Sequence, residues 1–237
     1  MKTLFVSLFS LLLLNLSFAQ NTEGTIHYKE MMKLDINLDG LKDLPEAMKA
    51  QIPTEQSSEY LLTFHPEASL YANVPKDENE DIDYKSEDED IQIQIQVENP
   101  DRAYFYDIKK RASTESQEFF GKKFLVGNTK PRKWKIGSET KEILGYTCKK
   151  ATATFEEGDL VEAWFSSSIP VEVGPSSFHG LPGAILSVRT KNGDYEIVAT
   201  KVAFKKVDRT VVVAPRKGKK VMAVQFKEIV EAKQKEM

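Results

Sequence analysis

The sequence predicts a mainly β fold of the α+β class: a single domain built on a curved antiparallel sheet of hairpins, with one or two covering helices. Hydrophobic and polar residues alternate with period two through most of the chain, which is typical of strands that bury one face. Short turn sequences separate these segments. With 237 residues, of which 41% are hydrophobic and 29% charged, the chain can form one globular core.

The N-terminal residues 1–19 are interpreted as a signal peptide. Lys2 supplies a positive charge, residues 4–14 form an apolar stretch, and small residues precede an expected cleavage site after Ala19. The stretch is shorter than the roughly 20 residues that a membrane-spanning helix needs. We therefore expect an exported mature chain, residues 20–237, without a transmembrane span, located in the periplasm or at the cell surface.

The first half of the mature chain predicts strands, one helix and an acidic loop. Strands are expected over 25–32, 60–65 and 69–74, and Pro66-Glu67-Ala68 joins the last two as a hairpin. Leucine and methionine recur at three- and four-residue steps over 38–51, which predicts a short amphipathic helix. Residues 76–101 contain eleven Asp and Glu but two Lys, which is typical of a solvated loop. Isoleucine and glutamine alternate within this loop and predict a strand over 91–97.

The second half predicts a series of hairpins and a terminal helix. Strands are expected over 103–110, 118–126, 134–136, 146–155, 160–166, 184–190 and 195–204. The last hairpin has Asn192-Gly193 at its centre, the preferred pair for a type I′ turn because both positions take positive φ. Residues 215–237 are basic, and a helix is expected over 221–236. From Lys201 onward eleven Lys and Arg oppose four acids, the reverse of the acidic loop.

Composition and motifs exclude several classes of function. The formal net charge of −3 argues against a nucleic-acid-binding protein. Cys148 is the single cysteine, so the chain can form neither an internal disulfide nor a multi-cysteine metal site. The histidines lack zinc-site spacing, and the sequence contains no phosphate-binding loop, dinucleotide fingerprint or serine-hydrolase elbow. We therefore assign no catalytic, cofactor-binding or metal-binding residues.

A partial calcium-loop pattern lies in the acidic loop. Its oxygen ligands would be Asp77, Asn79, Asp81, Asp83 and Asp88, at positions one, three, five, seven and twelve. Position six is isoleucine where the motif needs glycine, and position twelve is aspartate where the motif has a bidentate glutamate. A solvated loop without Ca²⁺ is therefore the favoured interpretation.

Residues 134–186 carry ordered blocks that resemble a known family. The blocks are Trp134-Lys135-Ile136, Gly145-Tyr146-Thr147-Cys148-Lys149-Lys150-Ala151, Ala163-Trp164-Phe165, Ile169-Pro170, Gly174-Pro175 and Phe178-His179-Gly180-Leu181-Pro182-Gly183-Ala184-Ile185-Leu186. In order and spacing they resemble the GLPGLI family, exported proteins mainly of Bacteroidota with no established activity. The signature residues are Trp134, Tyr146, Cys148, Trp164, Pro170, Gly180, Leu181, Pro182 and Gly183. The sequence departs from the family name at Ala184, where leucine would stand.

The central block predicts a type II turn over residues 181–184, because proline presets a negative φ and the following glycine accepts a positive one. A structural turn is favoured over a binding loop. His179 beside the turn is interpreted as a hydrogen-bonded structural residue rather than a base or metal ligand. Cys148, on the same strand face as Tyr146, is interpreted as a buried structural cysteine, with a redox, metal-binding or nucleophilic role as the alternative.

Three hypotheses for function stay open. The favoured one is a non-enzymatic envelope protein that binds a lipid, a hydrophobic peptide or a protein partner. Leu41, Leu44 and Met48 of the expected helix would then cover an apolar groove near His179. The predicted sheet is similar in outline to the half-barrel lipoprotein carriers of the envelope, a likeness of fold alone. The alternatives are a thiol- or metal-dependent activity centred on Cys148 and His179, and a surface interaction protein that uses its charge asymmetry.

Overall fold

The computed structural model describes residues 22–34, 53–74, 82–85, 92–95, 102–127, 132–154, 158 and 160–235. The strands in these ranges are β1 (Gly24–Lys33), β2 (Glu55–His65), β3 (Ala68–Asn73), β4 (Ile82–Lys85), β5 (Gln92–Ile95), β6 (Ala103–Asp107), β7 (Ala112–Phe119), β8 (Lys122–Gly127), β9 (Lys135–Ile143), β10 (Tyr146–Thr154), β11 (Leu160–Ser166), β12 (Ala184–Thr190), β13 (Tyr195–Phe204) and β14 (Lys219–Met222). The helix α2 (Ala223–Lys235) follows the last strand.

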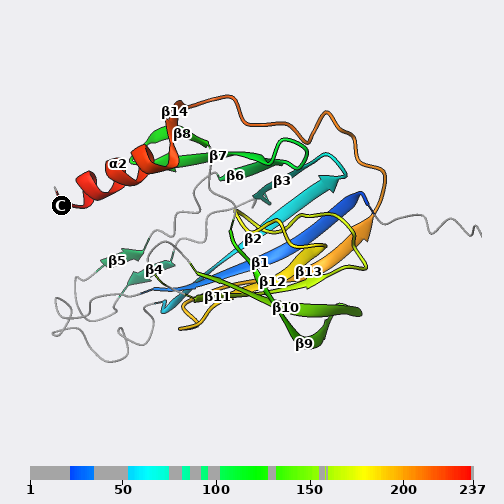
Figure 1. The fold of residues 1–237 in the computed structure, drawn as a ribbon. Helices are drawn as coiled ribbons and strands as arrows, with labels where there is room; N and C mark the ends of the chain where they lie inside the picture. The colour runs from blue at the N-terminus through cyan, green and yellow to red at the C-terminus, as the bar shows by residue number, and fades with distance from the viewer. Residues whose placement is uncertain are drawn as a thin grey trace, which may run out of the picture.

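Twelve of these strands form one sheet, in the order β14-β8-β7-β6-β3-β2-β1-β13-β12-β11-β10-β9 (Figure 1). The pairs are antiparallel except for β14 and β8, which run parallel. The strands β4 and β5 pair with each other in a separate two-stranded sheet. The predicted class, a mainly β domain on an antiparallel sheet with a covering helix, is confirmed.

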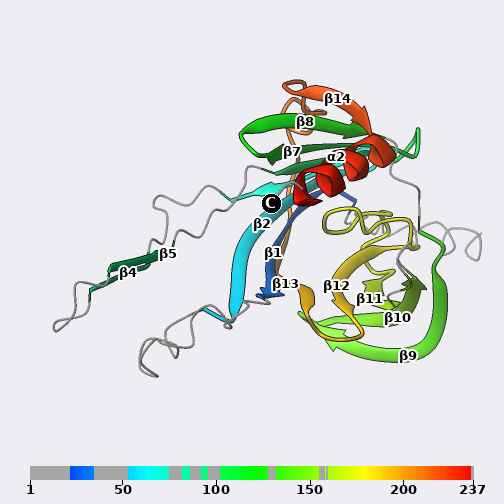
Figure 2. The same ribbon diagram turned by 90° about the vertical axis from the view of Figure 1, so that its left-hand side faces the viewer.

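The large sheet is strongly curved, as Figure 2 shows. The long segment between β11 and β12 lies inside the curve, close to the concave face. A direct contact spans this interior: the hydroxyl of Tyr28 in β1 donates a hydrogen bond of 2.6 Å to the carbonyl oxygen of Ile185 in β12. Helix α2 packs on the same concave side of β8, where Phe226 and Ile229 contact the buried Phe124. The curvature therefore creates an inner face that several segments can share.

The alternation predicted from the sequence produces the core. In β2 the buried apolar positions are Tyr60, Leu62 and Phe64, while the residues between them are more exposed. Burying a large apolar side chain of this kind stabilises the fold by about 2 kcal/mol. The strands expected over 160–166, 184–190 and 195–204 have the predicted bounds, and the strand expected over 25–32 and the hairpin of 60–65 with 69–74 are present within five residues of their predicted ends.

The strand predicted over 118–126 is wrong, because a tight turn interrupts it. Phe120 and Gly121 have φ values of 48° and 66°, and they separate β7 from β8. Strand β7 itself was not predicted. Its concave-facing residues include the polar Ser113 and Glu115, which are both buried, so the sequence lacks the apolar alternation that reveals most strands.

Other predicted boundaries also change. Trp134 lies just before β9, which continues to Ile143 with nearly every side chain exposed and thus without an apolar periodicity. The terminal helix begins at Ala223 because Val221 and Met222 belong to β14, which pairs with β8. The strand predicted over 103–110 ends at Asp107.

The type I′ turn predicted for the last hairpin is also wrong. Residues 191–194 form a four-residue loop, and the backbone N–H of Gly193 donates to the carbonyl oxygen of Thr190 at 3.0 Å. Gly193 has a φ of 76°, but Asn192 does not share a positive φ. A type I′ turn needs positive φ at both positions.

Several predictions fall outside the described residues. They are the signal peptide over 1–19, the helix over 38–51 with Leu41, Leu44 and Met48, and the oxygen ligands Asp77, Asn79, Asp81 and Asp88. Within the acidic segment, β5 agrees with the strand expected over 91–97, whereas β4, which contains Asp83, was not predicted. No helix in the described part of the chain is long and apolar enough to cross a membrane.

Candidate functional site

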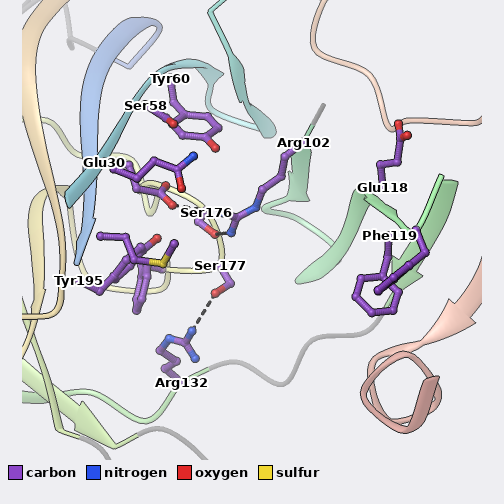
Figure 3. Close-up of a pocket in the computed structure, with 14 residues that line it drawn as sticks. Glu30, Ser58, Tyr60, Arg102, Glu118, Phe119, Arg132, Ser176, Ser177 and Tyr195 are labelled. Atoms are coloured by element: carbon purple, nitrogen blue, oxygen red, sulfur yellow. Dashed lines mark hydrogen bonds and ion pairs between the residues drawn. The ribbon is translucent and has the colours of Figure 1, made fainter. Parts of the chain in front are cut away.

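A pocket of about 800 Å³ opens on the concave face of the sheet (Figure 3). Strands β1, β2 and β13 form its floor, the segment between β11 and β12 forms one wall, and the β7–β8 hairpin forms another. Its lining residues are Glu30, Met32, Gln56, Ser58, Tyr60, Arg102, Glu118, Phe119, Phe120, Arg132, Ser176, Ser177, Phe178 and Tyr195. We call it the Arg102 pocket.

Strand register explains why the floor residues share one face. Glu30 in β1 stands opposite Ser58 in β2, and Met32 stands opposite both Gln56 in β2 and Tyr195 in β13. Side chains directly opposite in an antiparallel sheet point to the same side. Three strands that are far apart in the sequence therefore project polar and aromatic groups into one space.

Arg102 is the most highly connected side chain of the pocket. Its guanidinium donates to Glu115 through Nε at 2.9 Å, to Glu30 through Nη1 at 3.4 Å and to Ser176 through Nη2 at 2.5 Å. The side chains of Arg102, Glu30 and Glu115 are 24%, 13% and 8% exposed. Burial lowers the pKa of Arg102, but the two carboxylates outweigh it and the pKa is raised overall. Arg102 is therefore always positively charged, and its hydrogen bonds connect β1, β7 and the pocket wall.

Tyrosines surround this ion pair. The hydroxyl of Tyr71 donates to Glu30 at 3.1 Å, and the rings of Tyr71 and Tyr60 are stacked with centroids 4.7 Å apart. Burial first, and then the charge of Glu30, raise the pKa values of Tyr60, Tyr71 and Tyr195. All three phenols are therefore protonated at neutral pH and can donate hydrogen bonds.

The wall over residues 174–179 is held in place from two sides. Gly174 lies so close to the backbone of Phe178 that a Cβ atom would be 2.2 Å from the Phe178 carbonyl oxygen. From the other side, Arg132 donates to the hydroxyl of Ser177 at 2.7 Å and lies 4.4 Å from the centroid of the Phe178 ring. Trp134 Nε1 donates to the carbonyl oxygen of His179 at 2.9 Å. The pocket wall is therefore preorganised.

His179 lies behind this wall rather than in the pocket lining. Its side chain is 6% exposed, its Nε2 lies 3.2 Å from the hydroxyl of Tyr104, and its ring stacks on Tyr106. Burial, followed by the positive charge of Arg132, lowers the pKa of His179 to about 4. The imidazole is consequently neutral at physiological pH and packs as an aromatic ring.

Cys148 is fully buried in β10, and its Sγ donates to the carbonyl oxygen of Tyr146 at 3.4 Å. Burial raises the pKa of the thiol to about 11, against a smaller opposing effect of Lys141. Cys148 and His179 form their hydrogen bonds with different residues, Tyr146 and Tyr104. In the described residues no group of three or more His, Cys, Asp or Glu side chains is arranged to hold a metal ion.

The turn over residues 181–184 is not type II. The N–H of Gly183 donates to the carbonyl oxygen of Leu181 at 2.8 Å, two residues back, and the N–H of Ala184 donates to Ile169 at 3.0 Å. A type II turn would join Ala184 to Leu181. The residues instead form a tighter γ-type turn, and Ala184 is bonded to Ile169. Gly183 has a φ of 145°, and a Cβ there would be 2.2 Å from the carbonyl oxygen of Ser166.

The remaining signature residues are divided between the core and the surface. Leu181 is buried in the core, whereas Pro170, Gly180 and Pro182 are exposed. Tyr146 packs partly buried against the core. Trp164 does the same, and the ammonium group of Lys141 lies 4.4 Å from its ring centroid.

Sequence reasoning missed the Arg102 pocket. Its residues come from seven separate segments, each carrying one to three of the lining side chains. The one local signal is the run Ser176-Ser177-Phe178, which immediately precedes the central signature block. Aromatic rings, hydroxyls, an amide and charged groups line one open pocket, an arrangement suited to binding a ligand that has both apolar faces and many hydrogen-bonding groups.

A family model described as "N-glycanase peptide, N-terminal domain" matches residues 94–228, more than half of the chain. Two solved structures, of PNGF-II in the P21 and C2 space groups, are similar to the fold with TM-scores of 0.52 and 0.53. Each is 16% identical in sequence, and the matches cover 87% and 88% of this chain. This chain spans about a third, 32%, of the length of those proteins. A comparison with curated proteins gave no significant match.

Proposed function

This chain belongs to the family of N-glycanase N-terminal domains, and we propose that it is a non-catalytic, exported envelope protein that binds carbohydrate in the Arg102 pocket. The observation that carries the proposal is the composition of that pocket. Aromatic rings and fixed hydrogen-bonding groups line the same 800 Å³ space. The family description names a glycan-processing protein, which supports a glycan as the ligand.

The pocket chemistry fits a sugar better than an acyl chain. The C–H faces of a pyranose ring stack on aromatic rings, and Phe119, Phe120 and Tyr195 offer such rings. Sugar hydroxyls need donors and acceptors, which Gln56, Ser58 and other lining side chains provide. A lipid tail would remove polar lining groups from water and offer them no hydrogen bonds, at a cost in free energy. The ligand class expected from the sequence, lipid or hydrophobic peptide, is therefore the less favoured proposal.

The side chains that could act chemically are already engaged. Glu30 accepts hydrogen bonds from Arg102 and Tyr71, which supports a structural role over that of a general base. The raised pKa of Cys148 opposes a thiolate nucleophile, and the lowered pKa of His179 belongs to a ring packed between tyrosines. These features support binding without catalysis, and they give a thiol- or metal-dependent activity no positive support.

Calorimetric titration with a free N-glycan, and with a glycopeptide and its unglycosylated form, tests the proposal. The glycan and the glycopeptide should bind, and the bare peptide should not. Gln56→Ala and Phe120→Ala should each weaken binding by about tenfold, the effect of losing one stacking or hydrogen-bonding contact. Ile136→Ala is the matched control, because Ile136 is exposed to 48% on β9 and does not line the pocket.

Two results would overturn the proposal. Release of free oligosaccharide from the glycopeptide, detected by mass spectrometry, would show that the protein is catalytic. A retained acyl chain in native mass spectra of protein purified from its own envelope, with no glycan binding, would favour the hydrophobic ligand instead.

A further inference from the structure

The convex face of the sheet carries a surface that the proposed function does not use. After β13, residues 205–217 cross this face (Figure 1). Val207 and Val212 anchor the segment, because both are buried with Ala68 and pack against Leu70 and Phe105 on the outer side of β3 and β6. The segment is thus a fixed part of the fold.

The same anchoring turns other apolar side chains outward. Val211 and Val213 flank the buried Val212 and are 54% and 48% exposed. Met222, at the end of the adjacent edge strand β14, is 47% exposed. Large aliphatic side chains this exposed, gathered along one segment and its neighbouring edge strand, are characteristic of an interaction surface.

Basic side chains lie among these apolar ones. Lys123, Arg216 and Lys217 line a hollow of about 600 Å³ together with Val213, and Lys220 and Met222 line an adjoining hollow of about 460 Å³. Ala214 and Pro215 border both hollows, so the two are continuous. Among the described residues, neither hollow has a carboxylate in its lining. On the neighbouring strand β7, Glu118 stands opposite Lys123 across the β7–β8 hairpin.

The charge of this surface is concentrated, and only part of it is paired among the described residues. Residues 205–220 contain seven Lys and Arg and a single acid, Asp208, so the local net charge is 7 − 1 = +6. Arg209 pairs with Glu67 at 3.3 Å. Arg216, Lys217 and Lys220 take part in no ion pair within the described portion of the chain. Surface cations of this density attract an anionic partner.

We propose that this convex face is a docking surface for an anionic membrane. Cations near a bilayer are attracted to anionic headgroups, and exposed aliphatic side chains beside them can insert at the headgroup boundary. The valines favour a membrane over a soluble acidic polysaccharide, because a polysaccharide gains nothing from outward-facing aliphatic groups. Docking here leaves the Arg102 pocket, which opens on the concave face, directed away from the membrane.

Co-sedimentation with vesicles tests the proposal. The full chain should bind phosphatidylcholine vesicles that contain phosphatidylglycerol at least about tenfold more tightly than pure phosphatidylcholine vesicles, and added salt should weaken this binding. The triple variant Arg216→Glu, Lys217→Glu, Lys220→Glu should lose about a hundredfold in affinity. The matched control is Lys135→Glu, Lys149→Glu, Lys191→Glu, which changes the net charge equally on exposed residues elsewhere.

A second pair of variants separates membrane from polysaccharide. The double variant Val211→Ser, Val213→Ser should weaken vesicle binding and leave heparin binding unchanged, since heparin would bind through charge alone. Three outcomes overturn the proposal: no preference for anionic vesicles, an equal loss in the control triple variant, or vesicle binding that is indifferent to the two valines. Heparin binding without vesicle binding would assign the surface to an acidic polysaccharide instead. Glycan titration of the triple variant should be normal, so failure here is distinguishable from failure of the proposed function.

Discussion

The imidazole of His179 lies nearly parallel to the phenol ring of Tyr106, with 3.7 Å between ring centroids and 19° between the planes. Its Nε2 meets the hydroxyl of Tyr104, while Nδ1 is buried without a hydrogen-bond partner among the described residues. Protonation would place a charge on this buried ring beside Arg132, which explains the lowered pKa of about 4. Because protonation of His179 is unfavourable in this packed position, acid should destabilise the segment behind the pocket.

We expect the fold to lose stability as the pH falls from about 6.5 to 4. The unfolded histidine has a pKa near 6.5 and the folded one about 4, so in this window the unfolded state binds more protons. The contribution is fully present above pH 6.5 and amounts to about 3 kcal/mol. Denaturant titrations at several pH values measure it. His179→Phe should remove this part of the pH dependence, and an unchanged slope in the variant would contradict the assignment.

Arg102→Met should destabilise the protein strongly, because it leaves the carboxylates of Glu30 and Glu115 buried without their cation. Breaking such a pair costs about 3 kcal/mol. The thermal midpoint should then fall by about 6–12 °C for a domain of this size. Lys109→Met is the control, because Lys109 and Glu67 form an exposed ion pair, and its midpoint should not change measurably. Equal midpoints for both variants would rule out a central role for Arg102.

Gly183→Ala should be costly, whereas Gly180→Ala should be mild. Both glycines have positive φ, but a Cβ at position 183 would be 2.2 Å from the Ser166 carbonyl oxygen, and a Cβ at position 180 meets no atom within 4 Å. Gly180→Ala should therefore cost about 1 kcal/mol from backbone strain alone. Gly183→Ala adds a backbone clash, and we expect a loss above about 2 kcal/mol. Chemical denaturation compares the two, and equal losses would disprove the close approach to Ser166.

Cys148 should react slowly with a thiol reagent in the native state and rapidly in denaturant. Its side chain is fully buried, and its pKa of about 11 leaves almost no thiolate at neutral pH. Cys148→Ala should cost about 1–2 kcal/mol through lost packing. Cys148→Ser should cost more, because it buries a hydroxyl in an apolar site. Fast native labelling with an apparent pKa well below about 8 would revive the nucleophile hypothesis.

Much of the fold follows from local pattern. Strands β12 and β13 have the predicted bounds, because both are rich in aliphatic and β-branched residues and the polar, glycine-containing loop over residues 191–194 separates them. Strand β7 was not predicted, because its buried face carries the polar residues Ser113 and Glu115 and so lacks an apolar pattern. Those polar residues are satisfied only by partners from elsewhere, and a local pattern contains no information about such partners.

The sequence by itself determined that this protein is a mainly β domain, since period-two alternation is a property of neighbouring positions. It also indicated that Cys148 and His179 are buried structural residues, since burial of apolar residues follows the same local pattern. The tertiary structure alone decided where a ligand could bind. Arg102 contacts Glu115, Glu30 and Ser176, which lie 13, 72 and 74 positions away in the chain. Strand order and sheet curvature bring these residues together, and both depend on long-range pairing, which no local periodicity encodes.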